Sequence, residues 1–177
     1  MREMIGQAFG IIAIFLGFVS YQVKTKQQIL LAQAATCVCF CIHYFLLGAY
    51  TGLAMNGAAL LRNAAYACWQ KEGKADKRLP IFFAVLMGGL GIWAWDGWFS
   101  IFSVLGLILN SIGMAFTDPR MMRKSILVTS PMVIVYDVFV HSIGGVIYES
   151  VAIFSSVLGL WRTRQEKLTN EAKADTM

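Results

Sequence analysis

The sequence is poor in charged residues. Only 14% of its 177 residues are charged, whereas 58% are hydrophobic and the mean hydropathy is +0.62. Soluble domains average about 25% charged and about 45–50% apolar residues. The apolar residues fall in blocks long enough to cross the roughly 30 Å hydrocarbon layer of a membrane as helices. None of these blocks alternates apolar and polar residues, so the pattern argues against the strands of a membrane barrel.

The sequence also lacks the common signatures of catalysis. It contains no phosphate-binding glycine-rich loop, no HExxH pair and no nucleophile elbow. Cys37, Cys39 and Cys41 alternate, so only the first and third would share a helix face, and two thiols supply half of a tetrahedral zinc site. We therefore interpret the cysteines as small buried apolar residues and predict neither an enzyme nor a bound metal or other cofactor.

Seven apolar blocks predict an all-α polytopic membrane protein with seven transmembrane helices. The expected spans are 4–23, 28–47, 50–70, 79–95, 97–116, 124–141 and 143–162. Lys and Arg gather in the first, third and fifth loops and in the tail, whereas the other loops contain none. The positive-inside rule then predicts an outside N-terminus and a cytoplasmic C-terminus. This bias accounts for the net charge of +5, so we expect membrane lipid and not nucleic acid as a partner.

Two stretches, 41–69 and 136–162, resemble each other as helical hairpins. At a shift of 93 residues, Gly52 aligns with Gly145 and Asn56 aligns with Glu149. The match predicts two parallel three-helix repeats in a 3+1+3 arrangement, with a binding site at their interface. The expected units are the first repeat (1–70), a cytoplasmic loop and linker helix (71–96), the second repeat (97–162) and a cytoplasmic tail (163–177).

Polar residues inside the apolar blocks mark the candidate site. A charged side chain at the membrane centre costs about 2.5–3.5 kcal/mol on insertion scales, so such residues face a bundle interior, a wet cavity or a partner. The candidate substrate-binding residues are His43, Asn56, Arg62, Asn63, Asn110, Asp137 and Glu149. We expect them to line a hydrated cavity for a small polar solute, in which the histidine and the two carboxyl groups are candidate proton carriers.

The same residues also have a purely structural explanation. An Arg62–Glu149 pair or a His43–Asp137 pair would join helices without binding any solute. The guanidinium group of Arg62 is expected too deep in the membrane to reach the lipid headgroups. Its partner would then be Tyr66, a carboxylate or an anionic substrate.

Two further features have a structural and a functional interpretation. Trp93, Trp95 and Trp98 are typical of the aromatic belt at a membrane interface, although a ligand cage is an alternative. Pro131 lies within the sixth block and lacks an N–H, so it predicts a kink or hinge that Thr129 and Ser130 could stabilise.

Two motifs resemble the bacterial inner-membrane YgjV family. The first is HYFLLG at 43–48, followed by Asn56 and Arg62. The second is SIGG at 142–145, followed by Glu149 and the pair Trp161-Arg162. The resemblance extends to about residue 164 and implies an inner-membrane protein related to the SWEET, PQ-loop and nicotinamide-riboside transporters. Relatives of this kind also suggest a homo-oligomer.

We interpret the chain as a transporter or binder of a small polar solute that works by alternating access of two three-helix halves. PQ-loop proteins have Pro-Gln at the end of the first span, whereas this chain has Tyr21-Gln22, so Pro131 is the better candidate for a hinge. The alternative function is a receptor or assembly module that transports nothing and whose polar residues only specify helix packing.

Overall fold

Seven helices make up the described part of the chain, which comprises residues 2–22, 26–69, 78–115 and 119–174 of a computed structural model. They are α1 (Arg2–Gln22), α2 (Lys26–Leu47), α3 (Tyr50–Trp69), α4 (Arg78–Trp93), α5 (Ser100–Ala115), α6 (Pro119–Phe139) and α7 (Ile143–Ala174). These residues contain no strand, so the expected all-α fold is confirmed for them. Much of the expected basic loops, including 23–25 and 71–77, lies outside the described residues.

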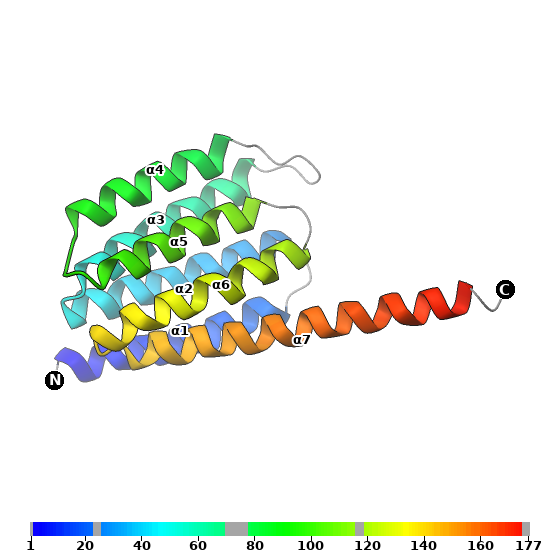
Figure 1. The fold of residues 1–177 in the computed structure, drawn as a ribbon. Coiled ribbons are helices and arrows are strands. Elements are labelled where there is room, and N and C mark those ends of the chain that lie inside the picture. The colour runs from blue at the N-terminus through cyan, green and yellow to red at the C-terminus, as the bar shows by residue number, and fades with distance from the viewer. Residues whose placement is uncertain (1, 23–25, 70–77, 116–118, 175–177) are drawn as a thin grey trace.

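The helices lie side by side, and six of them form a closed ring. α2 contacts α1 and α3, α6 contacts α5 and α7, and the contacts α3–α5 and α1–α7 close the ring. α4 packs on the outside against α3 and α5, as Figure 1 shows at the top of the bundle. The α2–α3, α4–α5 and α6–α7 connections lie at the same end as the N-terminus, and α7 extends beyond the other end.

The boundaries differ most from the sequence expectation at two helices. α6 begins at Pro119, before the expected start at 124, because a proline is favoured in the first turn of a helix, where no N–H is needed. α7 continues to Ala174, through most of the segment expected to be a tail. Figure 1 shows that this continuation extends beyond the bundle, and Arg123 of α6 donates to Thr163 near its start at 3.4 Å.

The two matching hairpins share the same backbone turn. The turn of the first hairpin contains Gly48 with a φ of 77°, and the turn of the second contains His141 with a φ of 54°. In both, the next amide donates to a carbonyl five residues earlier, as in a Schellman motif. These bonds are Ala49 N to Tyr44 O at 2.9 Å and Ser142 N to Asp137 O at 2.8 Å. The shift of 93 residues therefore relates two turns of the same geometry.

The interior of the bundle contains polar as well as apolar side chains, and its outer surface carries many large apolar ones. The buried polar residues are Thr36, His43, Thr51, Arg62, Asn63, Ser100, Ser103, Ser111, Thr129, Ser130, Asp137, Ser142 and Ser156. Large apolar side chains are instead exposed on the outside, including Phe15, Val85 and Phe154. Water-soluble proteins bury their aliphatic side chains and keep charged ones outside. The exposed large apolar side chains, together with a buried arginine and aspartate, suit a bundle surrounded by lipid.

Two stretches are long and apolar enough to cross a membrane by length and composition: Leu30–Leu47 in α2 and Ile143–Gln165 in α7. α4 and the Ser100–Gly113 part of α5 are apolar but shorter. Polar side chains on the inner faces of α3 and α6 lower the hydropathy of those helices.

α1 and α7 approach each other at two glycines. A Cβ atom added to Gly144 would lie 2.6 Å from the Cα of Gly10, and one added to Gly10 would lie 3.0 Å from the Cα of Gly144. The obstructing atoms belong to the backbone, which cannot rotate away as a side chain can. Small residues at such a crossing allow close helix packing, and this contact closes the ring.

We predict that Gly144→Ala lowers the free energy of unfolding by about 1–3 kcal/mol, because the added methyl group overpacks the α1–α7 contact. The matched control is Gly57→Ala, since a Cβ at Gly57 meets no atom within 4 Å. The control should leave stability unchanged or raise it by up to about 1 kcal/mol. Unfolding by SDS in detergent micelles measures both. Equal stabilities of the two variants would contradict the close contact.

Candidate functional site

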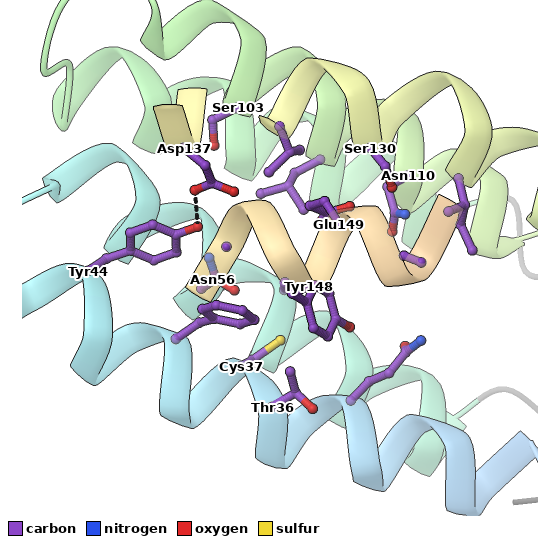
Figure 2. A pocket seen from close by; sticks show the side chains of 18 of the residues that line it. Thr36, Cys37, Tyr44, Asn56, Ser103, Asn110, Ser130, Asp137, Tyr148 and Glu149 are labelled. Atoms are coloured by element: carbon purple, nitrogen blue, oxygen red, sulfur yellow. Dashed lines mark hydrogen bonds between the residues drawn. The ribbon is translucent and has the colours of Figure 1, made fainter. Parts of the chain in front are cut away.

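A partly open cavity of about 90 Å³ lies inside the helix ring. This volume holds several water molecules. Its walls come from α2, α3, α5, α6 and α7, and six of the seven candidate residues line it: Asn56, Arg62, Asn63, Asn110, Asp137 and Glu149. Figure 2 shows the two carboxyl groups and Asn56 around this space. Residues separated by up to 93 positions in the sequence thus meet in one cavity.

The Arg62 guanidinium is held by neutral oxygen atoms. Its Nε and Nη2 donate to Asn63 Oδ1 at 3.2 and 3.1 Å, and its Nη1 donates to Ser111 Oγ at 2.8 Å and Asn110 Oδ1 at 3.3 Å. The side chain is buried. The Arg62–Glu149 pair considered from the sequence is not among these contacts. Arg62 instead joins α3 to α5 on one side of the cavity.

Asp137 uses one of its carboxyl oxygens to join α6 to α2. Its Oδ1 accepts a hydrogen bond of 2.6 Å from the Tyr44 hydroxyl, which Figure 2 marks. Its Oδ2 is buried and has no hydrogen-bond partner in the described part of the protein. Tyr44 and Asp137 are equivalent at the shift of 93 residues, so two matching positions of the hairpins contact each other.

His43 does not line the cavity. Its Nδ1 lies 2.7 Å from Gly6 O, and its Nε2 lies 2.8 Å from Ser142 Oγ. A carbonyl oxygen only accepts, so Nδ1 must carry the proton and Nε2 accepts from the serine hydroxyl. That hydroxyl also accepts from Gly145 N at 3.1 Å and caps α7. The one proton of the Ser142 hydroxyl is therefore donated to His43. The His43–Asp137 pair considered from the sequence is not formed.

Glu149 lies on α7 beside Ser130 of α6, whose hydroxyl is within hydrogen-bonding reach of the carboxyl group. Asn56, its equivalent in the first hairpin, donates from Nδ2 to Gly52 O at 3.0 Å. Pro131, next to Ser130, lies on the exposed side of α6, and the helix continues through it. The hinge expected at Pro131 is therefore next to a residue of the cavity wall. The side chains of Tyr21 and Gln22 lie outside the part of the protein that the structure describes.

The sequence analysis missed Asp96, which organises the end of the bundle near the N-terminus. Its Oδ1 accepts from Tyr50 N at 3.1 Å, and its Oδ2 accepts from Thr51 N at 2.8 Å, so it caps α3. Oδ2 also accepts from the Tyr136 hydroxyl at 3.0 Å. A carboxylate beside tryptophans in a loop was a visible signal, but nothing in the sequence indicates which helix it caps.

The tryptophans of this loop, Trp93, Trp95 and Trp98, are exposed and do not line the cavity. They lie at one end of the bundle, as expected of an interfacial belt. Two of them border a separate apolar hollow beside Tyr50.

Comparison with known families identifies the chain. The model of the Imp-YgjV family, described as bacterial inner membrane protein, matches residues 4–167. The chain belongs to this family. As a member of Imp-YgjV it is an integral protein of the bacterial inner membrane, in agreement with its apolar outer surface. Comparison with curated proteins and with solved structures finds no match.

We predict that Arg62→Lys lowers the free energy of unfolding by about 1–3 kcal/mol. A lysine carries its donors on one nitrogen and cannot bond Asn63 and Ser111 in the same fork geometry, so a buried acceptor loses its partner. The matched control is Arg164→Lys, which is exposed on α7 and should change stability by less than about 0.5 kcal/mol. Unfolding in mixed micelles compares the two variants. Indistinguishable stabilities would contradict the buried network.

Proposed function

We propose that this protein binds a small polar solute in the central cavity and carries it across the inner membrane by alternating access. The observation that carries the proposal is the cavity itself, which brings Asn56, Arg62, Asn110 and Glu149 together in the interior of an apolar bundle. Ionisable groups at membrane depth are costly and are typical of solute and ion pathways. A module that only packs helices would gain nothing from a partly open space among them.

The proposal includes seven membrane crossings, with the N-terminus outside and the C-terminus in the cytoplasm. The apolar outer surface extends over the exposed sides of α1 to α7, as Ile11, Ile92 and Phe154 illustrate. The polar side chains inside find their partners within the bundle, as lipid requires. Arg78 at the start of α4 and Arg120 and Arg123 at the start of α6 lie at the end opposite the N-terminus, so the positive-inside rule gives this orientation.

The proposal also treats α1–α3 and α5–α7 as two parallel halves, with α4 as the linker. Two observations support it. The hairpins α2–α3 and α6–α7 share the same turn geometry, and the contacts α3–α5 and α1–α7 are related by the same exchange of halves. Sites of repeat-built transporters lie at the interface of the repeats. The cavity takes its walls from both halves.

Binding and uptake test this function. We predict that one or more solutes of a metabolite panel raise the Tm of the purified protein and are taken up by proteoliposomes. Glu149→Gln removes a charged acceptor worth about 1.5–3 kcal/mol, which corresponds to about tenfold or more in affinity. Asn56→Ala should weaken binding by less, because its amide is neutral.

The matched control is Ser150→Ala, on the exposed face of α7 next to Glu149. Its hydroxyl donates only to Val146 O of its own helix, so solute affinity should be unchanged. A panel without any ligand, combined with variants that are merely less stable, would contradict the proposed function and favour an assembly module.

Topology is tested separately with reporter fusions. A fluorescent protein that folds in the cytoplasm should be active after residue 74 and after the C-terminus. Alkaline phosphatase, which needs the periplasm, should be active after residue 48 and after residue 97, because these positions lie in loops without Lys or Arg. The reverse pattern, or activity of both reporters at one position, would contradict seven crossings in this orientation.

A further inference from the structure

The hydrogen-bond donors of the cavity are largely used inside the protein. A guanidinium has five N–H donors, and Arg62 makes four hydrogen bonds to Asn63, Asn110 and Ser111. The Tyr44 hydroxyl donates to Asp137, and Asn63 Nδ2 donates to Cys37 Sγ at 3.8 Å. The donors of Arg62, Tyr44 and Asn63 are therefore engaged within the protein, and the one cation of the described walls faces neutral partners.

The acceptors of the same cavity are not used to the same extent. Asp137 Oδ2 and Gln33 Oε1 are buried side-chain oxygens without a hydrogen-bond partner among the described residues, and both residues line the cavity. A buried acceptor without a donor is destabilising. Glu149 adds a carboxyl group beside the Ser130 hydroxyl. Carboxyl and amide oxygens, two of them without a partner among the described residues, are thus part of the cavity wall.

Aromatic rings form part of the wall next to these acceptors. Phe40, Tyr44 and Tyr148 line the cavity, and the Phe40 and Tyr148 rings lie 5.1 Å apart at an interplanar angle of 80°. Figure 2 shows Tyr148 next to Glu149 and Tyr44 at Asp137. Ring faces attract organic cations, and the attraction is stronger where water is excluded. Carboxyl groups beside aromatic rings provide the surroundings that an ammonium group prefers.

From these three features we infer that the solute bound in the cavity is a small organic cation that donates hydrogen bonds, of the primary ammonium class. Its ammonium group is placed beside Glu149, against the aromatic wall. Arg62 is a positioning residue that holds Asn63 and Asn110 in the opposite wall. The inference rests on the proposed function and names the ligand class of that same site.

Three solutes of nearly equal size and different charge test the inference: ethanolamine, ethylene glycol and glycolate. We expect ethanolamine to raise the Tm of the purified full chain at constant ionic strength and neutral pH, and the neutral and anionic analogues to leave it unchanged. Titration calorimetry should then give an ethanolamine affinity that Glu149→Gln weakens by about tenfold or more. The matched control Glu3→Gln changes an exposed carboxylate at the start of α1 and should leave the affinity unchanged.

The possible outcomes separate the inference from the proposed function. Stabilisation by glycolate, or an ethanolamine affinity that Glu149→Gln does not change, overturns the cation inference while solute binding stands. The cation inference is also overturned, and solute binding stands, if ethanolamine has no effect but neutral or anionic members of the metabolite panel bind. If no member of the panel binds, the proposed function fails together with the inference.

Discussion

The structure depends on one constraint: polar groups inside an apolar bundle must find their partners within it. The buried guanidinium of Arg62 is surrounded by amide and hydroxyl oxygens, and the imidazole of His43 is fixed between Gly6 and Ser142. In water each of these groups would exchange partners freely, but in lipid an unpaired group costs several kcal/mol. The networks at the helix ends and in the interior are therefore what specifies how the helices meet.

The same constraint explains why two similar hairpins differ in detail. Ser142 caps its own helix, α7, with its hydroxyl. The equivalent residue before α3 is Ala49, which has no polar side chain, and here Asp96 of the α4–α5 loop supplies the acceptor. Because Asp96 caps α3 from a distant loop, it fixes that loop against the first hairpin. The starts of α3 and α7 are therefore capped by different means. The second hairpin also has Glu149 where the first has the neutral Asn56, so α7 contributes a carboxyl group to the cavity and α3 contributes an amide at the equivalent position.

The cavity has two chemically different walls. On the side of Arg62 the hydrogen-bonding capacity is nearly used up, so this wall acts as a structural clamp between α3 and α5. On the other side, Asp137 Oδ2 has no hydrogen-bond partner among the described residues, and aromatic rings lie close to Glu149. Under the proposed function, this difference between the two walls is what would select a solute by charge.

The sequence by itself determined the helical class and the location in a membrane, because hydrophobicity along the chain follows from lipid as a solvent. It also determined the polar positions: six of the seven candidate residues line one cavity, since residues such as Asn56 and Asn63, seven apart, share a helix face. Only the tertiary structure decided the pairing. It separated His43 from the cavity, gave Arg62 neutral partners in place of Glu149, and brought Asp96 to the end of α3. Partner choice depends on how distant helices are placed against each other, and no local spacing in the sequence encodes that placement.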